Sequence, residues 1–547
     1  MKTKTEAELG KILRRVGSVL GRLVSCTALA WGVGSLAEPS HANAAVDFAQ
    51  SVAVGHFNRV AANPGMDDVA IGNPLESGEA GSVTVWTWDT AGGTRTRVKL
   101  TQAFLRDNFQ ITSGVSSATI DTTTANDHFG AALATGDFNS DGLSDLAIGV
   151  PDEDVKYGTN VIIDSGYVHV LYGTSGSGWA GTPFQQKTRI LPNPFLRVPG
   201  TGDLGGEQFG FAVAVSKFNR DTVDDLAVGV PGAHGFSTVS KGMVYFYRGG
   251  PGTASAPIGT LDTSSTSLIE NPSGQGDQEA FGFSLAAGNF YNHPTTASTP
   301  RQIAIGAPNG LIPAGNVKRA GFVFVFDFVA SLDAIHPNLS SSRFYSQEIA
   351  SPATGGEKNE AYDHFGHSIA AVPMGGSDDP SALLVGAPYE DAGLADVGVV
   401  HFFSPANLVP PQIIYSDTFG VPVQAKAYFG RSVAGGLLRQ SSASPPLMGA
   451  IIGEPGRNSN TGAAYHFGET ATARQSLSLL ESWTSIFPAV EDRFGEVVTV
   501  GTPGPSESPD QVATTVGKGY VGVPGAKKVM QFNVGVTSSG KNQFRTP

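Results

Sequence analysis

The chain has 547 residues, with 70 glycines, 34 prolines, one cysteine, 15% charged residues and a formal net charge of −13. So few charged residues exclude a highly charged disordered chain. They also exclude a coiled coil, which needs abundant Lys, Glu and Leu at a period of about 3.5 residues. The acidic balance excludes nucleic acid as an expected partner, because phosphate binding needs clustered Lys and Arg.

Residues 1–44 are predicted to be a signal peptide. A basic start, which ends at Arg22, leads into the apolar run Leu23–Ala37, and Ala42–Ala44 forms a small-x-small cleavage site. Cleavage near Ala44 would export the chain to the periplasm, the cell surface or the medium. Cys26 lies inside this segment, so the mature chain has no thiol for a disulfide. No later apolar run reaches the roughly 18 residues of a transmembrane helix.

Residues 45–547 are predicted to repeat one unit seven times, with units starting near residues 46, 127, 207, 279, 363, 427 and 492. Each unit has a Phe-Gly pair, which is Phe48-Ala49 in the first, followed by Gly-x-Pro. The Phe-Gly pairs begin at Phe129, Phe209, Phe281, Phe365, Phe429 and Phe494. The Gly-x-Pro tripeptides begin at Gly72, Gly149, Gly229, Gly306, Gly386, Gly453 and Gly522. Self-similarity of this kind indicates a repeat architecture.

Each unit is predicted to form four short strands. The first alternates after Phe-Gly, as in Ala132–Thr135, and the second stops at Gly-x-Pro, as in Asp145–Gly149, because proline cannot donate to a β ladder. The third opens on glycine and is aromatic and β-branched, as in Gly242–Tyr247. A fourth, less regular run follows, as in Gln412–Tyr415. With no helical periodicity after the signal peptide, we expect an all-β seven-bladed β-propeller of four-stranded blades.

The last blade is predicted to be completed by the C-terminus. Only Ala45–Asp47 precede Phe48, which is too short for an additional N-terminal strand. We therefore expect Lys541–Thr546 to supply the outer strand of the last blade.

The second unit carries a family resemblance. Phe129-Gly130 and the run Gly136–Pro151 resemble the FG-GAP repeat of integrin α-subunit head domains and of many exported bacterial proteins. The resemblance covers about residues 45–547, with decay in the first and last units. It implies an integrin α-like propeller with calcium loops between the first and second strands of some blades, and a role in extracellular recognition.

One loop has the composition of a calcium site. Asp137, Asn139, Asp141 and Asp145 stand at positions 1, 3, 5 and 9, and Leu143 at position 7 can offer its carbonyl. Ca²⁺ prefers about 6–8 oxygen ligands, and Gly142 permits the sharp turn that gathers them. We therefore expect a structural Ca²⁺ here. The alternative is an Asp/Asn-rich turn without metal.

The corresponding loops of the other units are poorer. In the third unit Lys217 replaces the first ligand of the set Lys217, Asn219, Asp221 and Asp225, and we expect its ammonium group to replace the ion. Still weaker sets are His56, Asn58, Asp67 and Asp68 in the first unit, Asn289 and Asn292 in the fourth, and Asp378 and Asp379 in the fifth.

Other titratable positions favour structural roles. An acidic residue recurs two positions before Phe, at Asp127, Glu207, Glu279, Asp363 and Asp492, and is predicted to bond a turn or a neighbouring blade. His128 and His364 are interpreted as exposed, and Asp152–Asp154 and Glu390-Asp391 as solvated loops. No catalytic residue is predicted, because no Gly-x-Ser-x-Gly, His-Glu-x-x-His or phosphate loop occurs.

We therefore expect an exported, calcium-stabilised binding or adhesion module for protein or glycan ligands, monomeric and not an enzyme. Two alternatives stay open. A lectin-like propeller would need aromatic and polar residues repeated at equivalent exposed positions. A hydrolase or lyase with a site in the axial funnel would need converging titratable groups that break the repeat pattern.

Overall fold

The computed structural model describes residues 50–58, 68–88, 95–113, 118–120, 125–157, 160–175, 178–194, 205–234, 240–250, 262–272, 278–290, 301–313, 315–332, 334–350, 358–374, 380–404, 411–439, 447–470, 473–483, 493–500, 518–523 and 528–533. All of them belong to one compact unit, Ala45–Pro547. The predicted signal peptide, Phe48 and the predicted closing strand Lys541–Thr546 lie outside the described residues.

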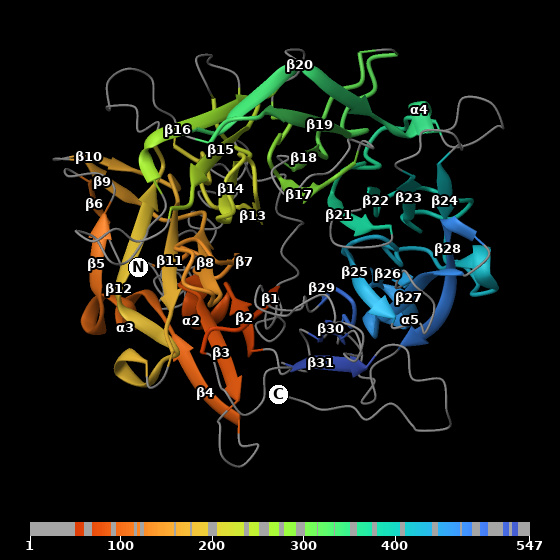
Figure 1. The fold of residues 1–547 in the computed structure, drawn as a ribbon. Helices are drawn as coiled ribbons and strands as arrows, with labels where there is room; N and C mark the ends of the chain where they lie inside the picture. Colours follow the sequence, from red (N-terminus) through yellow and green to blue (C-terminus); the bar gives the residue numbers. More distant parts are fainter. Residues whose placement is uncertain are drawn as a thin grey trace, which may run out of the picture. The chain divides into compact units, whose positions relative to one another are not determined.

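The described residues form an all-β propeller of four-stranded blades (Figure 1). In five blades four strands pair antiparallel in chain order, as the repeat predicts. Blade 1 contains β1 (Ser51–Gly55), β2 (Asp68–Asn73), β3 (Ser82–Trp88) and β4 (Arg95–Leu100). Blade 3 contains β13 (Ala212–Ser216), β14 (Asp225–Val230), β15 (Met243–Arg248) and β16 (Asp262–Glu270). Blade 4 contains β17 (Ser284–Gly288), β18 (Gln302–Ala307), β19 (Phe322–Val329) and β20 (His336–Tyr345).

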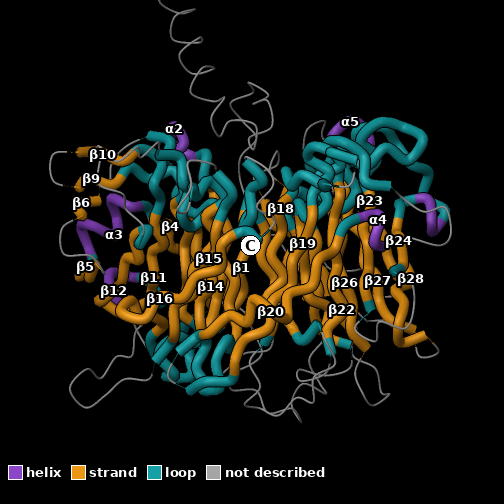
Figure 2. Tube along the Cα trace, turned by 90° about the horizontal axis from the view of Figure 1, so that it is seen from above, coloured by secondary structure: helices purple, strands orange, loops and turns teal. Residues whose placement is uncertain are grey.

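Blades 5 and 6 repeat the same arrangement. Blade 5 contains β21 (Ser368–Pro373), β22 (Ser381–Ala387), β23 (Val399–Phe403) and β24 (Gln412–Ile414). Blade 6 contains β25 (Val433–Arg439), β26 (Leu447–Glu454), β27 (Ala463–Thr470) and β28 (Ala473–Trp483). The first strands of consecutive blades contact each other and lie innermost in Figure 1, while loops gather at the two ends of the strands in Figure 2.

Blade 2 is larger than the repeat predicts. Its four repeat strands are β7 (Ala132–Gly136), β8 (Asp145–Val150), β11 (Tyr167–Gly173) and β12 (Phe184–Pro192). A fifth strand, β5 (Gln110–Ser113), pairs parallel with β12. The same region holds a small sheet of β6 (Ala118–Ile120), β9 (Val155–Tyr157) and β10 (Asn160–Ile162).

The predicted count of seven four-stranded blades is wrong. The described residues contain six blades with four or more strands. The last repeat contributes a sheet of three strands only, β29 (Val498–Val500), β30 (Lys518–Val523) and β31 (Lys528–Asn533), because its described part supplies no fourth strand. Its strand β29 contacts β25 of blade 6 and β1 of blade 1.

Short helices occur in the connections. They are α2 (Glu76–Glu79), α3 (Gln102–Asn108), α4 (Gln347–Ala350), α5 (Arg457–Asn460) and the 3₁₀ turns η1 (Trp179–Gly181) and η2 (Asp417–Phe419). Helix α3 was not predicted from the sequence; its first turn is capped by the Thr101 hydroxyl, which accepts from the Phe104 amide at 3.1 Å. Trp179 packs beside α3 and donates its indole N–H to the Asn108 carbonyl. Among the described residues no helix has the length and apolar character needed to cross a membrane.

The Phe-Gly and Gly-x-Pro motifs join neighbouring blades. Gly210 of blade 3 has φ +94°, which only glycine adopts readily, and its carbonyl oxygen would lie 2.0 Å from a Cβ atom on Gly149 of blade 2. Phe209 bridges Gly166, the glycine that opens the third strand of the preceding blade. Both contacts recur around the structure. The glycines are therefore needed because backbones of adjacent blades meet at these points.

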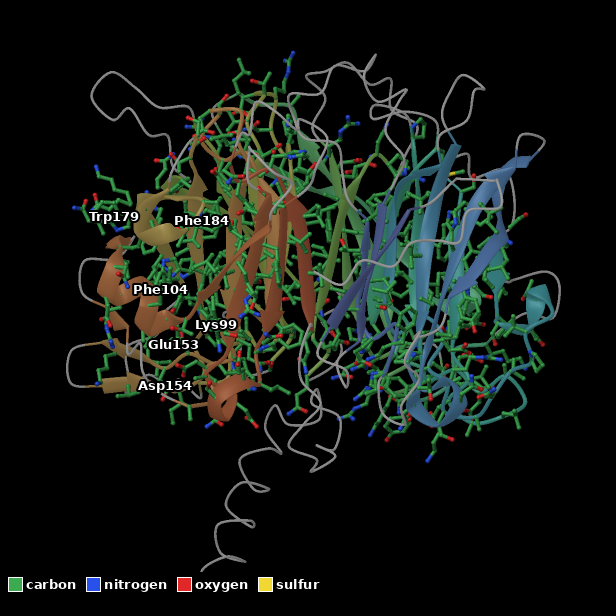
Figure 3. All side chains as sticks on the ribbon, turned by 90° about the horizontal axis from the view of Figure 1, so that it is seen from below. Lys99, Phe104, Glu153, Asp154, Trp179 and Phe184 are labelled. Carbon is green, nitrogen blue, oxygen red and sulfur yellow. The ribbon has the colours of Figure 1, made fainter. Side chains whose placement is uncertain are left out.

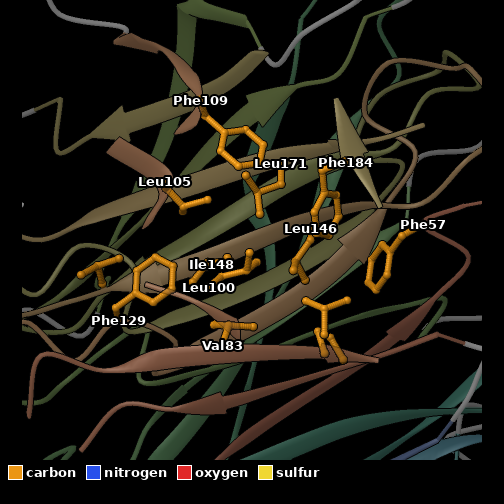
Figure 4. Close-up of a cluster of buried hydrophobic side chains, with 14 of the residues drawn as sticks. Phe57, Val83, Leu100, Leu105, Phe109, Phe129, Leu146, Ile148, Leu171 and Phe184 are labelled. Atoms are coloured by element: carbon orange, nitrogen blue, oxygen red, sulfur yellow. The ribbon is translucent and has the colours of Figure 1, made fainter. Parts of the chain in front are cut away.

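Phe side chains fill the space between blades. Every described Phe of a Phe-Gly pair is fully buried. Between blades 1 and 2, Phe129 packs with Val83, Leu105, Leu146 and Phe184 in the cluster shown in Figure 4. Burying a side chain of this size stabilises the fold by about 1.5–3 kcal/mol. The repeated Phe thus accounts for much of the cohesion between blades.

Candidate functional site

The predicted calcium loop joins β7 to β8, and its side chains accept hydrogen bonds from loop amides. Asp137 accepts from the amides of Asp141 at 3.0 Å and Gly142 at 2.9 Å. Asp141 accepts from the Leu143 amide at 2.9 Å and from the Asn139 side-chain amide at 3.0 Å. Asn139 in turn accepts from the Asp141 amide at 3.0 Å. These bonds fold the loop around its oxygen atoms.

Asp145 closes the loop from inside the blade. Its carboxylate is fully buried and accepts from the Phe138 and Gly173 amides, each at 2.9 Å. Burial, together with the charges of Asp141 and Asp137, raises the pKa of Asp145 well above its usual value. Burial also raises the pKa of Asp137, and the charge of Asp141 adds to that rise. The loop therefore concentrates negative charge that a cation would neutralise.

The donor set fits a hard cation in its chemistry. Ca²⁺ takes oxygen ligands only, and Asp137, Asn139, Asp141, Asp145 and the Leu143 carbonyl supply only oxygen. A carboxylate oxygen that accepts one N–H keeps a lone pair for a metal. Within the described ranges, however, no three His, Cys, Asp or Glu side chains are grouped closely enough to hold a metal ion.

Blade 3 contains the same loop with one decisive change. Asp221 accepts from the Val223 amide at 3.0 Å, and Asp225 accepts from the Phe218 and Gly249 amides, as in blade 2. Lys217 stands where blade 2 has Asp137, and its ammonium lies 2.6 Å from Asp224 Oδ1. The same Asp224 accepts from the Asp137 amide at 2.9 Å. A lysine therefore lies beside this acidic loop.

The weaker loops keep fewer of these features. Asp68 of blade 1 accepts from the Phe57 amide at 3.0 Å, as Asp145 does from Phe138 in blade 2. His56 and Asn58 flank Phe57. Asn289 is buried in blade 4. Asp67, Asn292, Asp378 and Asp379 lie outside the described residues.

The acidic residues before Phe are structural, as predicted. The four described members, Asp127, Glu207, Glu279 and Asp363, are almost fully buried. Glu279 accepts from Asn271 Nδ2 at 2.6 Å, and Asp363 accepts from the Glu360 amide at 2.8 Å. Asp492 lies outside the described residues.

The interpretation of His128 and the Asp152–Asp154 segment as exposed is wrong. His128 and Asp152 are half-buried and lie 2.5 Å apart, from Nδ1 to Oδ2. Glu153 is fully buried and accepts from Gln102 Nε2 at 2.6 Å; it lies near Asp154 and α3's Phe104 at one end of blade 2 (Figure 3). Glu390 is likewise buried and accepts from Gln347. Gln102 belongs to the insertion before blade 2 and Gln347 to α4 before blade 5, and the repeat pattern gave no sign of either contact.

A second set of residues, which the sequence analysis missed, lies where the innermost strands begin. We define the inner rim as the residues that follow each Phe-Gly pair or its equivalent: Gln50, Ala131, Phe211, Phe283, His367, Arg431 and Glu496. All seven are half-buried. Although the scaffold around them repeats, their chemistry differs from blade to blade. The only sequence signal was this variation at a fixed repeat position.

Inner-rim side chains of five consecutive repeats contact one another. The Phe211 and Phe283 rings lie 4.8 Å apart, and the Phe283 and His367 rings 5.0 Å apart, between centroids. Arg431 Nη1 donates to His367 Nε2 at 2.8 Å, and Arg431 Nε donates to Glu496 Oε1 at 3.2 Å. Within the inner rim, an aromatic part that contains Phe211 and Phe283 is therefore continuous with a polar, charged part that contains Arg431 and Glu496.

Comparisons with known proteins agree with the repeat. Residues 129–171 match the FG-GAP repeat family. The chain is 28% identical over 204 residues to integrin alpha-5 of Xenopus laevis, which covers 37% of this chain and 15% of the frog protein. These matches support an FG-GAP, integrin α-like propeller.

Other relatives of this FG-GAP propeller are enzymes by name. It is 30% identical over 267 residues to phosphatidylinositol-glycan-specific phospholipase D of Homo sapiens, which covers 47% of this chain and 26% of the human protein. The corresponding protein of Dictyostelium discoideum is 24% identical over 285 residues, which covers 50% of this chain and 27% of that protein. The chain thus spans about a quarter of the length of these relatives. The prediction that the chain is not an enzyme is wrong in light of these relatives, because they make hydrolysis a candidate activity.

Proposed function

We propose that this FG-GAP propeller is an exported module that binds a protein or glycan ligand at its inner rim, at the cell surface or outside the cell. The observation that carries the proposal is the variation of the inner rim. Residues that maintain a repeat, such as Phe209 and Gly210, are the same in blade after blade. Inner-rim residues such as Phe283 and Arg431 are half-buried yet differ, which is expected where an asymmetric ligand is recognised.

We also propose that calcium stabilises the ring. Asp137, Asn139, Asp141, Asp145 and the Leu143 carbonyl would hold Ca²⁺, which would neutralise the charge concentrated in the blade 2 loop. Its role would be to hold the β7–β8 connection in place. In the third repeat Lys217 would supply positive charge without a metal.

We further propose that the three-stranded sheet fills a seventh position in the ring. The contacts of β29 with β25 and with β1 support this closure. A closed ring leaves no blade face open to solvent, which matters because a single sheet cannot bury both faces alone.

The binding proposal is tested by screening the purified chain against arrays of glycans and surface proteins, with and without a chelator. A ligand retained in calcium and weakened in chelator supports both the binding role and the calcium role. Absence of any specific ligand on either array would argue against the binding role.

A hydrolase is the second candidate, favoured by the phospholipase D relatives. Its test is release of a phosphatidylinositol-glycan-anchored protein from vesicles that contain no other enzyme. Release by the wild-type chain, and its loss in a variant of the inner rim such as Arg431→Gln, would support a reaction at this site. No release above the protein-free control would contradict it.

A further inference from the structure

We infer that Arg431, Tyr389 and His367 form a subsite for an anionic group, a carboxylate or a phosphate ester, whose apolar part lies on Phe283 and Phe211. The inference deepens the proposed ligand-binding function and rests on it. It assigns a ligand chemistry to one half of the inner rim.

The first support is the geometry of Arg431. Its Nη1 donates to His367 Nε2 at 2.8 Å and to the Tyr389 hydroxyl at 3.1 Å, and its Nε donates to Glu496 at 3.2 Å. His367 and Tyr389 belong to the fifth repeat and Glu496 to the seventh, so contacts on both sides of Arg431 fix its guanidinium in one orientation. A fixed planar guanidinium is suited to carboxylate and phosphate, because little side-chain entropy is lost on binding.

The second support is the local charge. Arg431 and Arg493 both contact the carboxylate of Glu496, the latter at 2.9 Å. Burial lowers the pKa of His364 to about 4, and the positive charges of Arg319 and Arg431 contribute to that shift. The guanidinium groups therefore outnumber the carboxylate of Glu496, although the chain as a whole carries a net charge of −13. An anion would find positive charge at this part of the inner rim.

The third support is the supply of donors. The Tyr389 oxygen accepts from Arg431, so its own proton remains to be donated. Because Nε2 of His367 accepts from Arg431, the proton of the neutral imidazole is on Nδ1. Nδ1 is buried, so the Tyr389 hydroxyl is the donor of this pair that remains for a ligand oxygen.

The fourth support is the neighbouring aromatic surface. Phe283 contacts His367 on one side and Phe211 on the other. Both Phe side chains are half-buried, whereas Phe residues of the Phe-Gly pairs are fully buried. An apolar or aromatic ligand group attached to the anion would bury this surface.

The test is calorimetric titration of the purified full chain with phenyl phosphate, benzoate and inorganic phosphate. We expect saturable binding of phenyl phosphate or benzoate, and the tighter of the two identifies the source of the anion. Inorganic phosphate should bind at least severalfold more weakly than phenyl phosphate. Lack of saturable binding by all three probes would overturn the inference.

Variants distinguish a ligand role from a structural one. Arg431→Gln should weaken binding by about tenfold or more, since a charged hydrogen bond is lost. Glu496→Gln should strengthen binding severalfold, because it removes the carboxylate that competes for Arg431. A structural role alone would not produce this gain, and weaker binding in Glu496→Gln would contradict the inference.

Two further variants complete the design. Phe283→Ala should remove the preference for phenyl phosphate over inorganic phosphate. The control Arg106→Gln removes an exposed arginine that is also paired with a carboxylate, Asp107, and should leave binding unchanged. Equal losses in Arg106→Gln and Arg431→Gln would show binding to surface charge only.

The outcome also separates this inference from the proposed function. An array ligand that binds equally well to wild type and Arg431→Gln, and is not displaced by phenyl phosphate, would overturn the anionic subsite and leave the binding role intact. If phenyl phosphate binds at Arg431 but neither array yields a ligand, the anionic subsite is supported and the proposed binding of a protein or glycan is overturned.

Discussion

Gly149 and Gly210 stand in neighbouring blades, and a Cβ atom on Gly149 would lie 2.0 Å from the carbonyl oxygen of Gly210. The same contact recurs between Gly229 and Gly282, at 2.1 Å. Two motifs far apart in the sequence thus meet at each blade interface. Their repetition follows from a steric requirement, because a side chain at either point would separate the blades.

Gly149→Ala should therefore destabilise the propeller by about 3 kcal/mol or more, because backbone, unlike a side chain, cannot move aside. The measurement is the midpoint of thermal or denaturant unfolding. Gly393→Ala is the control, since Gly393 has φ +74° but no atom within 4 Å of an added Cβ. Gly393→Ala should lower the free energy of unfolding by only roughly 1–2 kcal/mol, which is the cost of a left-handed conformation in a residue other than glycine. Similar losses in both variants would contradict the steric account.

Calcium should raise the unfolding temperature of the wild-type chain. The expected stabilisation is about 2.7 kcal/mol at a hundredfold excess of calcium over Kd. Asp141→Ala should abolish the rise, because it removes a proposed ligand. Asp221→Ala, at the equivalent position of blade 3, should leave the rise intact. If calcium still raises the unfolding temperature of Asp141→Ala but not that of Asp221→Ala, the ion binds in blade 3, which would contradict the proposed site in blade 2.

Stability should depend on pH through Asp164. Burial, followed by the charges of Asp152 and Asp154, raises the pKa of the Asp164 carboxyl to about 7. The folded state therefore holds this proton more tightly than the unfolded state does. The contribution of Asp164 to stability is greatest below about pH 4 and is lost as pH rises towards 7.

Asp164→Asn should remove that loss. Relative to wild type, the variant should gain about 1–2 kcal/mol at pH 8, after allowance for partial exposure, and gain little at pH 4. Asparagine also tolerates the positive φ of +50° at this position. Urea unfolding at pH 4, 6 and 8 measures the difference, with exposed Asp107→Asn as the control. A gain that does not change with pH would contradict the raised pKa.

The pair formed by Arg457 and Glu454 should be important for stability. Arg457 donates to both Glu454 oxygens, at 3.2 and 3.0 Å, and the Glu454 side chain is completely buried. Arg457→Gln should cost about 3–5 kcal/mol, because it leaves a buried carboxylate without its cation. The double variant with Glu454→Gln should recover part of the loss. A double variant less stable than the single one would argue against this reason.

Repeat elements were predictable because each obeys a local rule. The run Gly242–Tyr247 predicted the third strand of blade 3, and the structure places β15 at Met243–Arg248. Phe129 and Phe209 stand at one repeat position, and both are buried between blades. Spacing alone indicated these positions because every blade meets its neighbour in the same way.

Features outside the repeat were not predictable in this way. Strand β5 pairs with β12 of the following blade, and nothing in its short sequence specifies that partner. The contacts of Phe283, His367 and Arg431 arise only when three repeats come together. The blade count failed at the last repeat, whose described part ends with β31. Long-range contacts, not local preference, decide the pairing of β5 and the contacts of the inner rim.

The most direct test of the central claim, that the varied inner rim binds the ligand, is equilibrium binding of the best array ligand to wild type and to Phe283→Ala and Arg431→Gln. The account predicts a loss of tenfold or more in the inner-rim variants, with unchanged melting temperature and unchanged binding in Arg106→Gln. Full affinity in both folded inner-rim variants would contradict it.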